Sequence, residues 1–221
     1  MLNRLFTFLF PPKCTLCRKI LSETETDLCH HCRIHAPKFE KSKFHIPFVA
    51  GWTAVWYYKD DVRRSLLRFK FYNARSYGAV YGKLMAMRLL QTHPDGIDIL
   101  TWVPIAPLRR LKRGYDQVEL IAKSVGEELR IPPRKVLQKI RNTPPQSGLQ
   151  DAAARRANVL GAYRVISAEE IAGKRILLLD DVITTGATAS ECARTLLTAG
   201  AKEVFFAGVA AATQDTKKKN M

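Results

Sequence analysis

An apolar strand pattern that runs into a polar turn and then a helix pattern constrains the fold of this chain most strongly. The stretch RILLLDDVITTGATAS, residues 175–190, begins with an unbroken apolar run, which is typical of a strand buried on both faces of a parallel sheet. The helical pattern that follows has Cys192 and Leu196 on one face. Similar strand and helix patterns alternate from residue 51 onward, so we expect an α/β domain with a mostly parallel sheet covered by helices on both faces.

The same analysis of periodicity and turn residues places the other elements. We expect a long loop or hairpin at residues 141–160, because Pro144, Pro145 and Gly148 lie there among polar residues, and long loops in compact domains are often functional. The expected strands are 51–58, 97–105, 136–140, 162–166 and 203–210, and the expected helices are 60–72, 78–91 and 117–130.

Two C-x-x-C pairs near the N-terminus predict a metal site. They place four of the five cysteines within 19 residues of one another, at Cys14, Cys17, Cys29 and Cys32. Four thiolates in a tetrahedral arrangement bind Zn²⁺ in closed structural sites, and the metal can hold together a module too small for its own core. Two disulfides or free cysteines are the rival interpretation, and the histidines at positions 30 and 31 also allow a mixed ligand set.

The charge balance is strongly basic. The chain has 36 Lys and Arg against 20 Asp and Glu, a formal net charge of +16. This excess favours nucleic acid, an anionic membrane surface or a phosphate-rich ligand as partner, whereas a basic surface that serves only solubility is the alternative.

No stretch approaches the ~20 apolar residues of a membrane span. We expect the apolar start of the chain to form a short helix docked on the body, with peripheral membrane contact as the alternative.

The polar residues after the strand pattern predict one ligand with hydroxyl groups and a phosphate. Asp180 and Asp181 are suited to accept hydrogen bonds from the vicinal hydroxyls of a ribose. The threonine turn that follows can cradle a phosphate with backbone N–H groups at a helix N-terminus; it consists of Thr184, Thr185, Gly186, Ala187 and Thr188. A ribose 5-phosphate satisfies both halves, and the stretch matches neither GxxxxGK[ST] nor GxGxxG. The alternative is an ordinary strand end and turn without a ligand.

ILLLDDVITTGATA resembles the signature that type I phosphoribosyltransferases use to bind 5-phosphoribosyl 1-pyrophosphate (PRPP). The wider chain resembles the ComF family of competence-related, phosphoribosyltransferase-like proteins. The resemblance also rests on PPKCTLC…CHHC, YYKDDVRRSLLRFKFY, VPIAPLRRLKRGYDQ and RNTPPQSGLQDAAARRANVLGAY, so it spans nearly the whole chain. It implies a type I phosphoribosyltransferase fold at residues 46–213, a small zinc-ribbon or zinc-finger module at 1–45 and a basic tail at 214–221.

The resemblance also implies roles for individual residues in binding PRPP and Mg²⁺. Asp180 and Asp181 would hold the ribose hydroxyls, and the threonine turn would hold the 5′-phosphate. The turn Pro104, Ile105 and Ala106 would be the pyrophosphate loop, and the cations Arg109, Arg110, Lys112 and Arg113 follow it. The 141–160 stretch would be a hood that closes over the ligand, with Arg141, Thr143, Gln146, Arg155 and Arg156 as its candidate residues. Mg²⁺ would bridge pyrophosphate oxygens and water.

Two functions are compatible with these residues. In the first, a PRPP- and Mg²⁺-binding protein of DNA uptake handles incoming single-stranded DNA in natural transformation, beside a ComFA-type helicase at the cytoplasmic side of the inner membrane, as the resemblance implies. In the second, a phosphoribosyltransferase displaces pyrophosphate and transfers ribose 5-phosphate to an unidentified acceptor. No general base stands out, because the five histidines lie outside the motifs that build the site. The oligomeric state is left open.

Overall fold

A four-stranded parallel sheet organises the structure, which is a computed structural model that describes residues 10–40, 44–92, 96–143 and 152–213. The strand order is β1 (Gly51–Tyr57), β6 (Glu203–Ala211), β5 (Arg175–Ile183) and β2 (Ile99–Trp102), and all neighbours pair in parallel. The apolar N-terminal segment before Phe10, Gln146 of the expected hood and the C-terminal tail lie outside the described residues.

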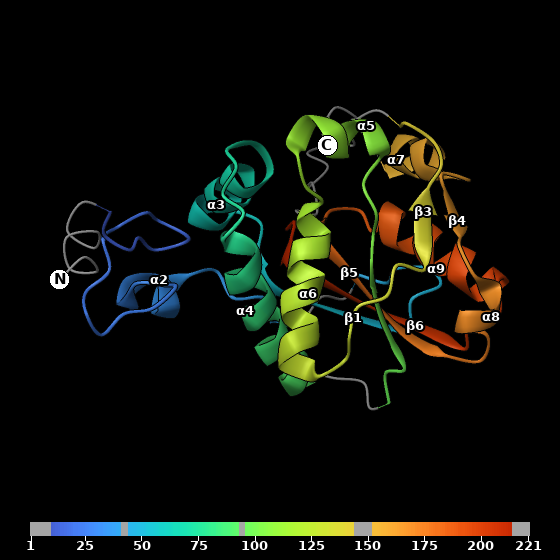
Figure 1. Ribbon diagram of the computed structural model, residues 1–221, viewed down its shortest axis with the longest axis horizontal. Helices are drawn as coiled ribbons and strands as arrows, with labels where there is room; N and C mark the ends of the chain where they lie inside the picture. Colours follow the sequence, from blue (N-terminus) through green and yellow to red (C-terminus); the bar gives the residue numbers. More distant parts are fainter. Residues whose placement is uncertain (1–9, 41–43, 93–95, 144–151, 214–221) are drawn as a thin grey trace, which may run out of the picture.

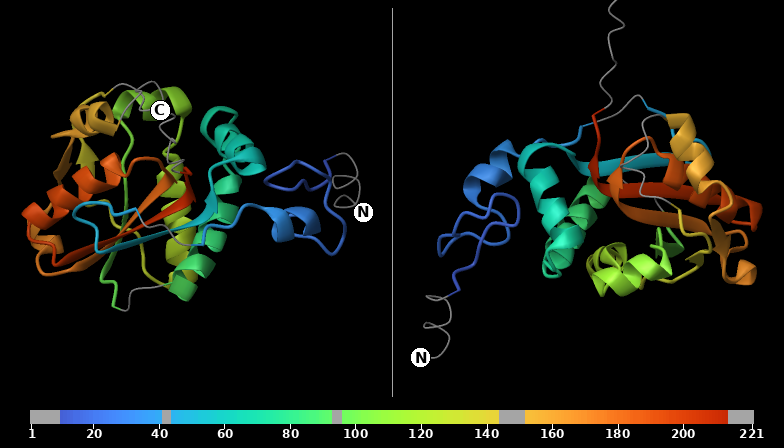
Figure 2. Two further views of the ribbon diagram at one scale, coloured as in Figure 1. Left: turned by 180° about the vertical axis from the view of Figure 1, so that it is seen from behind. Right: turned by 90° about the horizontal axis from the view of Figure 1, so that it is seen from above.

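Helices cover both faces of this sheet (Figures 1 and 2). Helices α4 (Tyr77–Thr92) and α6 (Gln117–Leu129) lie on one face, and α9 (Ala187–Thr198) lies on the other. The residues of β5 divide between the two layers: Leu177 and Leu179 belong to the core with α4 and α6, while Ile176 and Leu178 belong to the core with α9. The strand needs apolar residues at successive positions because both of its faces are buried.

The expected elements are present, with differences at their ends. Strand β5 continues through the acidic pair to Ile183, and β2 is shorter than the expected 97–105. Helix α3 (Asp60–Phe71) precedes α4, and β3 (Leu137–Lys139) pairs in antiparallel orientation with β4 (Tyr163–Val165) in a small separate sheet. A short helix, α8 (Ala168–Ile171), leads into β5.

Two helices lie in segments for which the sequence predicted no helix. The basic segment after β2 is helix α5 (Pro107–Arg113), which begins with proline at its first turn and ends at Gly114 in the left-handed conformation, φ +78°. The second half of the expected 141–160 loop is helix α7 (Ala152–Val159). Its alanine-rich sequence has a high helix propensity, and the turn residues Pro144, Pro145 and Gly148 precede it, outside the described residues.

The N-terminal cysteine module docks on α3. Its only helix among the described residues is α2 (His30–His35), and Leu16 is fully buried in the same apolar cluster as Leu66 of α3. Ser65 Oγ donates a hydrogen bond to the Thr15 carbonyl at 2.5 Å, and Arg68 donates to the carbonyls of Thr15 and Leu16. The module therefore contacts the chain's own α/β part. The described helices include none that is long and apolar enough to cross a membrane.

Candidate ligand-binding site

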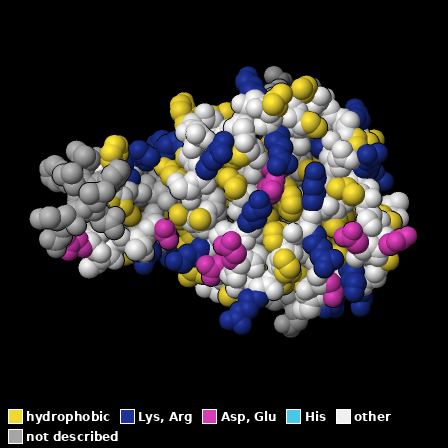
Figure 3. Space-filling model, in the orientation of Figure 1, with side chains coloured by type: hydrophobic (Ala, Val, Ile, Leu, Met, Phe, Trp, Pro, Cys, Tyr) yellow, Lys and Arg dark blue, Asp and Glu magenta, His cyan; other side chains and the backbone are white. Residues whose placement is uncertain are grey.

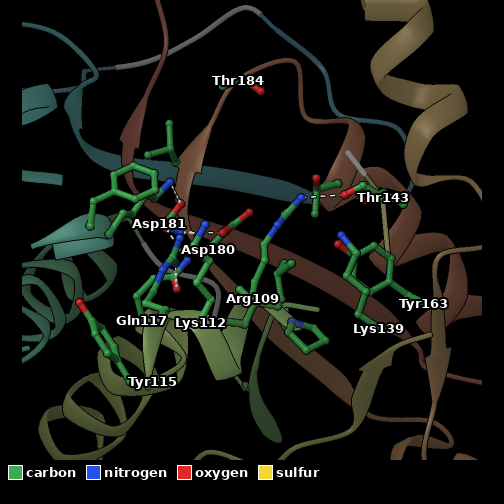
Figure 4. Close-up of a pocket in the computed structure, with 18 of the residues that line it drawn as sticks. Arg109, Lys112, Tyr115, Gln117, Lys139, Thr143, Tyr163, Asp180, Asp181 and Thr184 are labelled. Atoms are coloured by element: carbon green, nitrogen blue, oxygen red, sulfur yellow. Dashed lines mark hydrogen bonds and ion pairs between the residues drawn. The ribbon is translucent and has the colours of Figure 1, made fainter. Parts of the chain in front are cut away.

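A cavity of about 780 Å³ opens where the parallel strands β2 and β5 end (Figure 4). Its lining comes from these strand ends, α3, α5, the start of α6, α7, the β3–β4 pair and the start of α9. The carboxyl ends of parallel strands are the usual position of ligand sites in such sheets. Eleven of the residues singled out from the sequence line it: Pro104, Ile105, Arg109, Lys112, Arg113, Thr143, Arg155, Asp180, Asp181, Thr184 and Thr188.

Asp181 is held by two side chains from different helices. The residue is 4% exposed, and its carboxylate lies 2.8 Å from the ammonium of Lys70 on α3 and accepts a hydrogen bond from Gln117 Nε2 of α6 at 2.9 Å. Arg113 in turn donates to the side-chain oxygen of Gln117. The position of this carboxylate is therefore fixed from three segments of the chain.

The surroundings of Asp180 raise the pKa of its carboxyl group. Its Oδ1 accepts the backbone N–H of Asp181 at 2.7 Å. Burial and then the nearby Asp181 carboxylate raise the pKa of Asp180 to about 8, although the Lys70 ammonium acts in the opposite direction. The pair therefore retains a proton near neutral pH, so that one carboxyl can donate a hydrogen bond while the other accepts.

The threonine turn connects β5 to α9 through Gly186, which adopts a left-handed conformation with φ +74° at the helix N-cap. A Cβ at this position would lie 2.9 Å from Ile46 Cγ1, so the turn requires glycine for both conformation and space. Thr184 and Thr188 line the cavity, whereas Thr185, Gly186 and Ala187 form the turn between them. The first N–H groups of α9 have no partners within their own helix and are oriented to bind an anion.

The turn from Pro104 to Ala106 is fixed by Asp116, the N-cap of α6. Its Oδ1 accepts the N–H groups of Val118 and Glu119, and its Oδ2 accepts the N–H of Ile105 at 3.4 Å. Burial raises the pKa of Asp116, while these hydrogen bonds oppose the shift. Pro104 and Ile105 line the cavity, whereas Ala106 is buried beside it.

The predicted cations do not all converge on the cavity. Arg109, Lys112 and Arg113 line it from α5, but Arg110 points away and lies 3.3 Å from the Glu119 carboxylate. The expected set of four cations from this segment is thus reduced to three, because a helix directs successive side chains to different sides.

The expected hood residues also divide. Arg109 donates a hydrogen bond at 2.7 Å to the carbonyl of Thr143, which lines the cavity together with Arg155. Arg141 instead donates to the Leu160 carbonyl at 2.6 Å, and Arg156 is exposed on α7.

Sequence reasoning did not single out Lys70, Gln117, Lys139 or Tyr163, all of which line the cavity. Gln117 and Lys139 are buried, at 5% and 7% exposed, which is unusual for such polar side chains. The one signal available from the sequence was the position of Lys139 in a short strand pattern between apolar residues, VLQKI.

The four cysteines of the N-terminal module converge as the spacing predicts. Their Sγ atoms all lie within 4.8 Å of one another, and Cys17 Sγ is 3.7 Å from Cys29 Sγ. Tetrahedral Zn²⁺ with Zn–S bonds of about 2.3 Å separates its sulfur ligands by roughly 3.8 Å, whereas a disulfide needs about 2.05 Å. The cluster thus fits a structural zinc ion, and the two histidines at positions 30 and 31 are not part of it.

Comparisons with known proteins agree with this arrangement. The family model for the phosphoribosyl transferase domain matches residues 119–221. Competence protein F of Haemophilus influenzae is 27% identical over 190 residues, which cover 83% of this chain and 78% of that protein. Competence protein ComFC of Bacillus subtilis is 27% identical over 147 residues, 66% of this chain and 58% of that protein. DNA utilization protein YhgH of Escherichia coli O157:H7 is 25% identical over 205 residues, 86% of each.

The domain match includes β5, the threonine turn and α9, and the relatives extend the similarity over most of the chain. The parallel sheet with helices on both faces and the four-cysteine cluster complete the pattern. The chain is therefore similar over most of its length to two competence proteins and a DNA utilization protein, and its α/β part has the type I phosphoribosyltransferase fold.

Proposed function

We propose that this protein binds PRPP with Mg²⁺ and acts in DNA uptake during natural transformation. The observation that carries the proposal is a single cavity in which an acidic pair at the end of β5 lies beside the N-terminus of α9. This arrangement suits a ligand that presents hydroxyls to Asp180 and Asp181 and a 5′-phosphate to the turn from Thr184 to Thr188.

The charge of the cavity supports a ligand with several phosphates. Six basic side chains line it against the two carboxylates of the acidic pair, and they come from α3, α5, β3 and α7: Lys70, Arg109, Lys112, Arg113, Lys139 and Arg155. The cations from α5 lie directly after the turn from Pro104 to Ala106, so we place the pyrophosphate there, with charge-assisted hydrogen bonds from the guanidinium groups.

Magnesium fits the same position by the chemistry of its donors. Mg²⁺ takes oxygen ligands and keeps several waters, and it is usually held by one or two carboxylates together with substrate phosphates. The acidic pair, Asp180 and Asp181, retains one proton near neutral pH and so offers one carboxylate to the ion in this cavity. Bound there, the ion would neutralise part of the pyrophosphate charge.

The role in DNA uptake is supported by the names of the relatives, two of which are competence proteins and one a DNA utilization protein. The formal charge of +16 and the basic side chains spread over the face in Figure 3 favour a polyanionic partner. Leu66 and Phe69 are core residues, but Phe71 and Tyr72 are 67% and 76% exposed. Exposed rings beside cations suit stacking with the bases of single-stranded DNA.

We extend the proposal to the setting in which such DNA would be met. The protein would lie at the cytoplasmic side of the inner membrane, with peripheral membrane contact, and would work with a ComFA-type helicase. The basic surface is compatible with both the strand and an anionic bilayer.

Transfer of ribose 5-phosphate to an acceptor is the second candidate function. It is favoured by the buried position of Asp181 and by the three α5 cations, which would stabilise a departing pyrophosphate. Arg155 on α7 and Thr143 would help to exclude water. Pyrophosphate release that depends on an added acceptor would support this function.

The experiment is a calorimetric titration of Mg²⁺–PRPP into the wild type and into Asp180→Asn/Asp181→Asn at physiological salt. The matched control is Glu127→Gln/Glu128→Gln, which neutralises two exposed carboxylates on α6. Saturable binding by wild type and control, weakened at least about tenfold in the Asp variant, supports the proposal. Absence of binding by the wild type refutes it, and the DNA-binding surface would then be tested alone through its salt dependence.

A further inference from the structure

Lys139 is a buried cation without a carboxylate partner in the part of the chain that the structure describes. Its side chain lines the cavity from β3 and is 7% exposed. It lies over the ring of Tyr163, with Nζ 5.1 Å from the ring centroid, and no described Asp or Glu oxygen lies within 4.0 Å of it. Burying a cation is unfavourable unless a negative group compensates it.

The acidic groups nearest to Lys139 supply little negative charge. Burial raises the pKa of Asp180 and of the Cys192 thiol, and the same is true of the Tyr163 phenol. These groups are therefore largely protonated near neutral pH. Lys139 itself has a lowered pKa, first because of burial and second because Arg109 carries a like charge beside it.

Arg109 is held in place at the same end of the cavity. Its Nη2 donates to the Thr143 carbonyl at 2.7 Å, and Figure 4 shows its side chain extending between the acidic pair and Thr143. The guanidinium has five N–H donors, so this bond leaves others for a ligand. Lys139 is fixed by its place in the antiparallel pair, opposite Tyr163.

We propose that Lys139 and Arg109 form an anion-binding subsite, separate from the threonine turn, that takes a phosphate or carboxylate group. The inference rests on the proposed function for the identity of the ligand in the rest of the cavity. Two sources present this chemistry there: the pyrophosphate of PRPP, or the anionic group of a second substrate. An anion at this subsite would compensate both cations and form charge-assisted hydrogen bonds to them.

Three variants of the full-length protein test the subsite. Lys139→Met keeps the length of the side chain and removes its charge, and Lys139→Arg keeps the charge. Lys135→Met makes the same charge change at an exposed position just before β3. Each variant is titrated calorimetrically with Mg²⁺–pyrophosphate, with inorganic phosphate and with ribose 5-phosphate.

We expect Lys139→Met to weaken binding of Mg²⁺–pyrophosphate or inorganic phosphate at least tenfold, while Lys139→Arg and Lys135→Met stay within about threefold of the wild type. Without ligand, Lys139→Met should melt at the same temperature as the wild type or higher, because a buried, uncompensated charge has been removed. A purely structural lysine would give the opposite change in melting. Unaltered binding of both anions by Lys139→Met overturns the proposal.

A competition experiment distinguishes the two sources. Inorganic phosphate is titrated into protein already saturated with Mg²⁺–PRPP. Loss of the Lys139-dependent phosphate binding assigns the subsite to the pyrophosphate, whereas retained binding assigns it to a second substrate. If the wild type binds neither PRPP nor ribose 5-phosphate but still binds phosphate through Lys139, the proposed function fails while the subsite stands.

Discussion

The Lys70 ammonium lies 2.8 Å from Asp181 Oδ1, which pairs a residue of α3 with the end of β5 across the mouth of the candidate site. This contact explains how two adjacent carboxylates can lie so close to a turn suited to bind phosphate. Lys70 compensates the charge of Asp181, and the raised pKa of Asp180 keeps a proton on the pair. An incoming phosphate group therefore meets a cavity whose lining is basic in sum.

We predict that Lys70 and Asp181 are energetically coupled. The side chains are 21% and 6% exposed, so removal of one partner leaves the other poorly solvated. Asp181→Asn and Lys70→Met should each lower the free energy of unfolding by about 2–3 kcal/mol, and the double variant should recover about 1–2 kcal/mol of the summed loss. Urea unfolding of the four proteins gives the coupling energy. Additive effects, within about 0.5 kcal/mol, would show that the contact is not formed in solution.

We predict that the N-terminal cysteines hold one zinc ion and that the metal supports the α/β part. Cys14→Ser should lose the metal and lower the melting temperature. The module packs Leu16 into the apolar cluster that includes residues of α3, and its carbonyls accept hydrogen bonds from Ser65 and Arg68. A loss of about 2–3 kcal/mol corresponds to roughly 5–10 °C for a chain of this size.

Cys192→Ser is the control for the zinc prediction, since Cys192 is equally buried but lies outside the cluster. It should retain full zinc stoichiometry in metal analysis, even though a hydroxyl in an apolar core lowers stability. Full zinc content and unchanged melting in Cys14→Ser would refute the zinc assignment.

The fold was largely predictable from the sequence where an element buries a regular face. Strand β5 has a long apolar pattern because it lies in the interior of the sheet, and helix α9 has one because it packs against a face of the sheet. Helix α5 gave no such signal, because it has no buried residue and Leu108 and Leu111 are 63% and 81% exposed. Its formation depends on local signals alone, the proline at its start and Gly114 at its end.

The candidate site was predictable only where its residues are adjacent in the sequence. The acidic pair and the threonine turn form one continuous motif, so their juxtaposition needs no knowledge of tertiary structure. Lys70 and Gln117 reach Asp181 from helices 111 and 64 residues away in the chain. Their role follows from how α3 and α6 pack beside β5, and no local pattern encodes that packing.

We predict that Gly186→Ala weakens both folding and phosphate binding. The φ of +74° disfavours a side chain, and the new Cβ would lie 2.9 Å from Ile46 Cγ1. The variant should lose about 2 kcal/mol of stability, because conformational strain and a steric clash add. Affinity for ribose 5-phosphate should fall at least about tenfold, since the turn positions the N–H groups at the start of α9.

Gly161→Ala provides the matched comparison for this glycine. Its φ is +65°, but no atom lies within 4 Å of the added Cβ. It should lose about 1 kcal/mol from strain alone and leave ribose 5-phosphate binding unchanged. Equal effects of the two substitutions in chemical denaturation and calorimetry would contradict a special role for the threonine turn.

The raised pKa of Asp180 predicts the pH dependence of stability. A carboxyl whose pKa is about 8 in the folded protein and about 3.9 when unfolded retains its proton longer in the folded state. The stability that this carboxyl contributes to the folded state is therefore fully present below about pH 4 and is lost progressively as the pH rises to about 8. Asp180→Asn removes the ionisable group. The difference in unfolding free energy between this variant and the wild type should therefore grow in favour of the variant from about pH 4 to about pH 8 and stay constant above that.

Thermal melting of the ligand-free proteins between pH 5 and 9 measures this difference. Glu128→Gln, which neutralises an exposed carboxylate on α6, serves as the control and should follow the wild type at every pH. A constant difference between Asp180→Asn and the wild type from pH 5 to 8 would mean that Asp180 is already ionised at pH 5. The acidic pair would then carry two negative charges near neutral pH, and the cations around it would have to compensate both before a phosphate could bind.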